Sequence, residues 1–219
     1  MLNGINRHSS KPRFICKIFQ RTSMVSYEIF KRYNGKMWFT PICRHLEISY
    51  ETIESRLVQS FQYVTPETNN RSCYSFTFSS IIRDTGSTFD SIIRELIEKS
   101  GNKGKYDDGI RGHLEFLKSC ENSLDKSSVG FNYDQKTILP FKTCGDSSPL
   151  WWQAYNKVKH YEVGNYAFGN LENALVAVAA LAVLQVMICN NTTSKIFHNI
   201  GIVYPDTDPS ISADNLLFP

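Results

Sequence analysis

A run of 16 residues, Ala174 to Cys189, is apolar except for Gln185. Five of these residues are alanines, which pack helices closely, and Glu172 and Asn173 stand directly before the run. A helix that crosses a membrane needs about 20 apolar residues, so this run is short for that role. A helix that is apolar on all sides is instead typical of the centre of a bundle. We therefore expect a core helix and no membrane insertion.

Three amphipathic segments before this run predict helices that surround it. Apolar residues recur every three or four positions in residues 48–64, 74–99 and 108–122. This spacing places them on one face of an α-helix. A further helix is expected after Ser148 and Pro149, because serine favours the position before a helix and proline favours its first turn. The chain is therefore expected to be all-α, a bundle of about five helices.

The remaining segments are expected to be irregular. Residues 123–148 contain Pro140 and many Ser, Asp and Lys residues, which predict a long loop with a brief strand at residues 137–141. The apolar residues 200–204 in the tail would add one strand or cover the bundle. These patterns predict a basic N-terminal extension, a helical bundle, and a C-terminal tail that packs on the bundle, at residues 1–44, 45–191 and 192–219.

Positive charge is concentrated at the start of the chain. Residues 1–36 hold eight Lys or Arg residues and one acidic residue, whereas the other residues carry a net charge of −4. Clustered positive charge attracts phosphate backbones or anionic surfaces, and the alternative is a solvated leader. The apolar stretch at residues 14–19 is short and is interrupted by Lys17, unlike the core of a signal peptide. We therefore expect a cytoplasmic protein.

The six cysteines are expected to be free thiols. They are scattered without a CxxC pair, and no histidine stands at the spacing of zinc ligands. The sequence also lacks the Walker, GxGxxG, HExxH and GxSxG motifs. It therefore predicts no metal and no cofactor.

The decapeptide WWQAYNKVKH, residues 151–160, combines aromatic, amide and basic side chains in one helical segment. Asn156 and His160 are four residues apart, so they share a helix face, with Lys157 and Lys159 adjacent. Such a pair near a helix end either orders a neighbouring loop through hydrogen bonds or forms a reactive polar site.

This decapeptide and the apolar helix after it resemble the C-terminal half of HEPN-superfamily proteins. The resemblance covers residues 74–191 and implies a small helical bundle, often dimeric, of prokaryotic toxin–antitoxin, abortive-infection or antiphage systems. Nucleolytic members carry an arginine, a polar residue beside it and a histidine, which act on RNA at a cleft between two protomers. His160 matches the histidine and Asn156 the polar residue, whereas Tyr155 stands in the place of the arginine.

The missing arginine bears directly on RNA cleavage. Metal-independent cleavage needs proton transfer, which histidine performs near neutral pH, and a fixed cation that holds the phosphate. Tyr155 supplies no charge, so cleavage would need a substitute cation. The candidate residues fall into three groups: catalytic His160, Asn156 and Lys157; RNA-phosphate-binding Lys159, Arg83 and Arg94; and interface-forming Trp151, Trp152 and Tyr155.

Two functions remain open from the sequence. The first is an RNA-directed HEPN-like protein of a prokaryotic defence or stress module, a ribonuclease only if another cation replaces the arginine. The second is a non-enzymatic helical module that forms a homodimer or binds a partner protein of a defence system.

Overall fold

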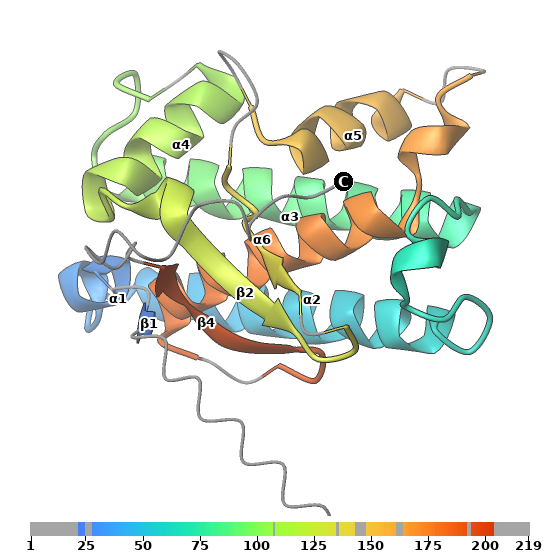
Figure 1. The fold of residues 1–219 in the computed structure, drawn as a ribbon. Helices are drawn as coiled ribbons and strands as arrows, with labels where there is room; N and C mark the ends of the chain where they lie inside the picture. The colour runs from blue at the N-terminus through green and yellow to red at the C-terminus, as the bar shows by residue number, and fades with distance from the viewer. Residues whose placement is uncertain are drawn as a thin grey trace, which may run out of the picture.

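Six α-helices, three short 3-10 helices and four short strands lie in the part of the chain that the structure describes. The computed structural model describes residues 22–24, 28–106, 108–134, 136–142, 148–160, 164–191 and 194–203. The helices are α1 (Glu28–Tyr33), α2 (Phe39–Ser60), α3 (Phe76–Lys99), α4 (Gly109–Cys120), α5 (Leu150–Lys159) and α6 (Leu171–Cys189). The strands are β1 (Thr22–Met24), β2 (Ser127–Phe131), β3 (Thr137–Ile138) and β4 (Phe197–Val203) (Figure 1).

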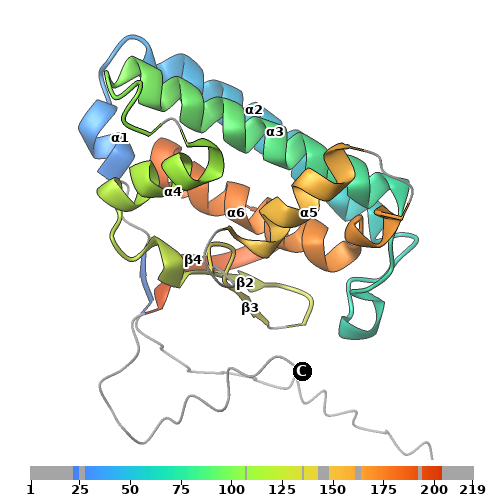
Figure 2. The ribbon, with the colours of Figure 1, turned by 90° about the horizontal axis from the view of Figure 1, so that it is seen from above.

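The apolar run forms α6, which lies at the centre of the bundle. It contacts α1, α2, α3 and α5, and its remaining side contacts β2 and β4. Figure 2 shows α6 between the α2–α3 pair and the sheet. Every residue from Ala177 to Ile188 is buried. By length and composition α6 could cross a membrane, but most of it is buried inside the bundle, which is consistent with the core of a soluble protein.

Both ends of α6 are defined by asparagines. The side-chain oxygen of Asn170 accepts a hydrogen bond from the backbone N–H of Asn173 at 2.9 Å, which caps the start of the helix. Asn190 ends the helix in the left-handed region, with φ of 52°. These caps fix where the apolar rod begins and ends.

The predicted helical bundle is confirmed, with differences at its edges. α3 and α4 lie where the periodicity predicts them, and α6 lies where the apolar run predicts a helix. α2 begins at Phe39, nine residues before the predicted start at residue 48, and Pro41 lies in its first turn, where proline is tolerated. Because α1 also contacts α6, the bundle includes residues from the range 1–44. Most of the basic residues 1–36, and the tail after residue 203, lie outside the described residues.

A small antiparallel sheet covers one side of α6. Its strand order is β1-β4-β2-β3, with Thr22 opposite Val203 and Ser127 opposite Ile202. β3 and β4 confirm the brief strands expected in these two regions. The prediction of a long loop at residues 123–148 is wrong in one respect, because β2 lies within it and is buried along its whole length.

α5 packs antiparallel on α3. The ring of Phe89 lies 5.3 Å from that of Trp151 and 6.1 Å from that of Trp152, measured between centroids. One turn earlier on α3, Gly86 lies against the ring of Tyr155, and a Cβ atom at Gly86 would stand 2.4 Å from a ring carbon. The end of α5 therefore lies beside the N-terminal half of α3.

The start of α5 has no side-chain cap. Pro149 occupies the position before the helix, and no side chain caps the first turn, contrary to the predicted role of Ser148. Ser148 instead contributes its backbone carbonyl, which accepts a hydrogen bond from the side-chain amide of Gln153 at 3.1 Å. The predicted helix start is thus displaced by one residue.

Candidate functional site

The residues of the decapeptide divide into a buried set and an exposed set. The buried set is Trp151, Trp152, Ala154, Tyr155 and Val158. The exposed set includes Asn156, Lys157, Lys159 and His160, which we call the basic end of α5. All three predicted catalytic residues, His160, Asn156 and Lys157, therefore lie at the protein surface, and His160 directly follows the last turn of the helix.

The three residues predicted at an interface lie in the core of the chain itself. Trp151, Trp152 and Tyr155 are 0%, 7% and 6% exposed, because they face α3. The indole N–H of Trp151 also donates to the carbonyl of Pro140 at 2.9 Å. Little of their surface remains for a partner. Tyr155, which the resemblance sets at the place of the arginine, packs in the core of this chain.

The two candidate arginines lie at different levels of α3. Arg83 is half-buried and lies one turn before Gly86 on α3, close to the position along α3 at which α5 ends. Arg94 lies about three turns further along α3, where its guanidinium pairs with Asp90 at 2.9 Å. Measured along the axis of α3, Arg83 therefore lies near the end of α5 that carries His160, and Arg94 lies further away.

The partner of Arg94 also faces a buried histidine of α4. His113 is 4% exposed, and its Nδ1 atom lies 3.6 Å from a carboxylate oxygen of Asp90. Burial lowers the pKa of His113, the charge of Asp90 opposes this shift, and the charge of Arg94 adds to it. His113 is therefore held in its neutral form inside the bundle.

We expect the free energy of unfolding to fall as the pH drops through about 6.5, the ordinary pKa of histidine. The folded state disfavours the charged imidazole, so the unfolded chain takes up the proton first and acid favours unfolding. Urea denaturation between about pH 7.5 and pH 5.5 measures this fall. The His113→Asn variant should show a smaller fall in the free energy of unfolding over this pH range. The His45→Asn variant, changed at an exposed position of α2, should show the same fall as the unmodified chain. Equal pH dependence in both variants would contradict the assignment.

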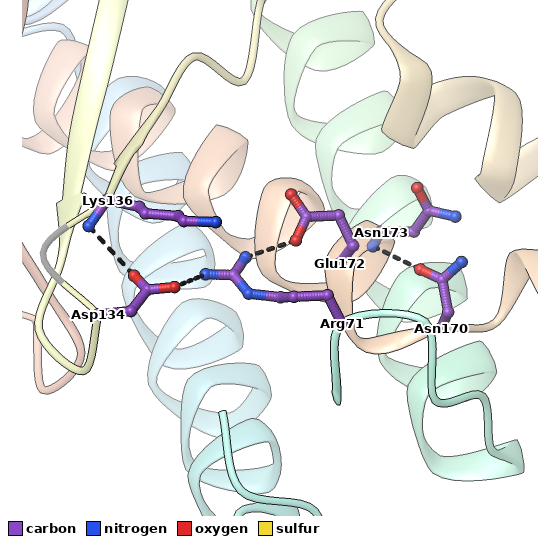
Figure 3. Close-up of polar contacts among 6 residues, drawn as sticks. All are labelled: Arg71, Asp134, Lys136, Asn170, Glu172 and Asn173. Carbon is purple, nitrogen blue, oxygen red and sulfur yellow. Dashed lines mark hydrogen bonds and ion pairs between the residues drawn. The ribbon is translucent and has the colours of Figure 1, made fainter. Parts of the chain in front are cut away.

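A second polar cluster, not predicted from the sequence, joins three distant segments. Arg71 donates from one terminal nitrogen to Glu172 and from the other to Asp134, each at 2.5 Å (Figure 3). Its guanidinium also lies 5.2 Å from the ring centroid of Phe131. We call Arg71, Asp134 and Glu172 the Arg71 clamp. It ties the segment before α3 to the turn after β2 and to the first turn of α6.

A cleft of about 520 Å³ lies beside the Arg71 clamp. Ile138, Leu139 and Val176 contribute apolar walls, and Lys136 and Lys142 also line it. The size is typical of a small-molecule site. The charged groups of Arg71 and Glu172 that line it are engaged with each other. The cleft is also lined by the first residue of α5, so it lies at the opposite end of that helix from His160.

Four exposed aromatic side chains lie next to the basic end of α5. They are Tyr74, Phe76, Tyr166 and Phe168, which we call the aromatic platform, and they are 64%, 73%, 49% and 39% exposed. The ring centroids of Phe76 and Tyr166 are 6.3 Å apart. The short helical turn Tyr166–Phe168 contacts α5, and the side-chain amide of Asn165 donates to the carbonyl of Lys157 at 3.3 Å. The turn that carries Tyr166 and Phe168 therefore adjoins the last turns of α5.

The described residues offer no evident metal site. Within them, no group of three or more His, Cys, Asp or Glu side chains is placed to hold a metal ion. Cys43, Cys73, Cys120 and Cys189 are free thiols, and the other two cysteines lie outside the described residues.

Comparison with protein-family models, curated proteins and solved structures gives no match. The resemblance to HEPN proteins therefore depends on the decapeptide and the helix that follows it.

Proposed function

We propose that this chain is an HEPN-like, RNA-directed protein of a prokaryotic defence or stress module, which contacts RNA through the basic end of α5. One observation carries the proposal: the decapeptide buries its aromatic residues and exposes Asn156, Lys157, Lys159 and His160 together. Ammonium groups attract phosphates, and an exposed imidazole can exchange protons near neutral pH.

Cleavage of the bound RNA requires a cation in place of the missing arginine. Tyr155 packs against Gly86 and has no charge to offer. Lys157 is exposed beside His160, and Arg83 stands at the same level on α3, so these two residues are the candidates. Lysine holds a phosphate as a point charge, whereas arginine can grip two oxygens at once. In this proposal RNA binding is the primary property, and cleavage depends on one of these cations.

Replacing Lys157 and Lys159 together by alanine is expected to weaken RNA binding. The slope of log Kd against log salt concentration should also fall by about 0.7 for each phosphate of single-stranded RNA that is no longer neutralised. Fluorescence anisotropy of a labelled RNA across a salt series measures both effects. Lys118→Ala, at an exposed position of α4, is the matched control and should change neither. Absence of RNA binding by the unmodified protein would overturn the proposal.

His160→Ala separates binding from cleavage in the same preparation. An enzyme would lose about 10²- to 10⁴-fold in cleavage rate, as is typical when a general acid or base is removed, with RNA affinity little changed. If neither form cleaves the labelled RNA and both bind it equally, the ribonuclease activity is excluded and the binding function stands.

The second candidate is a non-enzymatic helical module that forms a homodimer or binds a partner protein. The aromatic platform favours it, because exposed apolar patches commonly mark interaction surfaces. Sedimentation velocity of the purified chain over a range of concentrations tests self-association. A concentration-dependent dimer that is lost in Phe76→Ala would support this candidate.

A further inference from the structure

We propose that the aromatic platform stacks unpaired bases of single-stranded RNA while the basic end of α5 holds the neighbouring phosphates. This inference rests on the proposed function and deepens it by naming the form of RNA that is bound. It starts from the exposure of the platform: Phe76 is 73% exposed and Tyr74 is 64% exposed, although most large apolar side chains of the described residues are buried. Exposed rings carry a free face on which a base can stack.

The platform is held rigidly by the backbone on which its rings are mounted. The segment before α3 runs antiparallel to the segment before α6. The N–H of Ser75 donates to the carbonyl of Gly169 at 3.0 Å, and the N–H of Leu171 donates to the carbonyl of Cys73 at 2.9 Å. Tyr74 and Asn170 also form an antiparallel bridge. Tyr74 therefore stands on a short two-stranded ribbon, and Phe76, Tyr166 and Phe168 stand close to its ends, at the start of α3 and in the turn before Gly169.

Side chains fix this ribbon to the bundle. The Arg71 clamp holds one of its ends against α6, and Asn170 and Asn173 hold the other strand (Figure 3). The side-chain amide of Asn173 also donates to the carbonyl of Phe168 at 2.9 Å. Gly169 approaches α3 so closely that a Cβ atom there would stand 1.9 Å from the hydroxyl oxygen of Ser79. A platform that is already ordered loses little conformational entropy when it binds.

The charge beside the platform favours RNA over an apolar partner. Asn165 joins the Tyr166–Phe168 turn to the carbonyl of Lys157, which brings the last turns of α5 beside the platform. Lys157 and Lys159 are exposed there, and the ammonium group of Lys159 lies 5.4 Å from the ring centroid of Tyr155. A groove with cations for the backbone and rings for the bases is the arrangement used by proteins that bind single strands. A paired duplex keeps its bases stacked inside and presents no free base to the rings. The platform should therefore select single-stranded over double-stranded RNA.

The test is a comparison of variants in RNA binding at several salt concentrations. Phe76→Ala and Tyr166→Ala should each weaken binding of a labelled single-stranded RNA about 5- to 150-fold, the loss expected for one stacked base. The salt slope should stay unchanged, because the cations that meet the phosphates remain in place. Binding of a duplex of the same sequence should change little. Tyr63→Ala, which removes a ring that is 87% exposed outside the platform, is the matched control and should bind normally.

The outcomes separate this inference from the proposed function. If the unmodified chain binds RNA and the two-lysine variant weakens it, but Phe76→Ala and Tyr166→Ala do not, the stacking role is overturned and the RNA-binding function stands. If the unmodified chain binds no RNA, both fail. If the platform variants keep RNA affinity but convert a dimer to a monomer in sedimentation, the surface is a contact between copies. Thermal unfolding followed by circular dichroism checks that each variant is folded.

Discussion

Glu54→Ala is expected to lower the free energy of unfolding by about 3–5 kcal/mol, because it removes the acceptor of a buried network. Glu54 is 2% exposed. One of its oxygens accepts hydrogen bonds from the hydroxyl of Tyr50 at 3.0 Å, from the hydroxyl of Ser194, and from the backbone N–H of Lys195 at 2.9 Å. Burial raises the pKa of Tyr50 well above its usual range, so the phenol stays protonated and donates. The carboxylate thereby joins α2 to the segment that leads into β4.

Urea denaturation at neutral pH measures this effect. Glu54→Gln keeps one acceptor oxygen and should cost less than Glu54→Ala. Glu51→Ala, one turn earlier on an exposed position of α2, should stay within about 0.5 kcal/mol of the unmodified chain. A loss below about 1 kcal/mol for Glu54→Ala would show that the donors find other partners, and the network would then be unimportant for stability.

Gly86→Val should destabilise the chain by about 3 kcal/mol through overpacking between α3 and α5. Helix propensity alone would favour the opposite sign, since glycine is the worse helix former. The contact with Tyr155 decides the sign of the change in stability, because a Cβ atom at position 86 would stand 2.4, 2.5 and 2.8 Å from three ring carbons of Tyr155. Tyr155 cannot move freely, because its ring centroid lies 4.8 Å from that of Trp152.

The neighbouring position supplies the control for this substitution. Ser87→Val places the same side chain on an exposed position of α3 and should change stability by less than about 0.5 kcal/mol. The double variant Gly86→Val with Tyr155→Leu should recover part of the stability, because a smaller side chain makes room, and the double-mutant cycle gives the coupling energy. Equal effects of Gly86→Val and Ser87→Val would contradict this packing of α5 on α3.

Much of the fold follows from local patterns in the sequence. The apolar positions of α3 repeat with the helical period over 24 residues, and α6 is a continuous apolar run, so both are predicted without tertiary information. β2 carries no such signal, because its five residues include two serines and a glycine. Its register depends on β4, where Ser127 pairs with Ile202. A strand that is specified by a partner so far along the chain cannot be found locally.

The candidate site is predictable to a similar extent. The surface placement of Asn156 and Lys157 follows from the turn of one helix. The Arg71 clamp does not, because Arg71 meets Asp134 and Glu172 across 63 and 101 residues. The aromatic platform does have a signal in the sequence: two Tyr-x-Phe triplets, at residues 74–76 and 166–168, stand at or shortly before the start of a long helix.

β4 is an inner strand of the sheet, and this position affects how the chain folds during synthesis. β4 pairs with β1 on one side and β2 on the other, and it packs on α6. During translation this strand leaves the ribosome after every helix of the bundle, so one flank of the apolar rod stays open to water until then. Exposed apolar surface on a nascent chain is prone to aggregation, and a chaperone would find its binding site there. The rate of synthesis and the binding of chaperones are therefore expected to matter most for α6, the most apolar helix of the described residues.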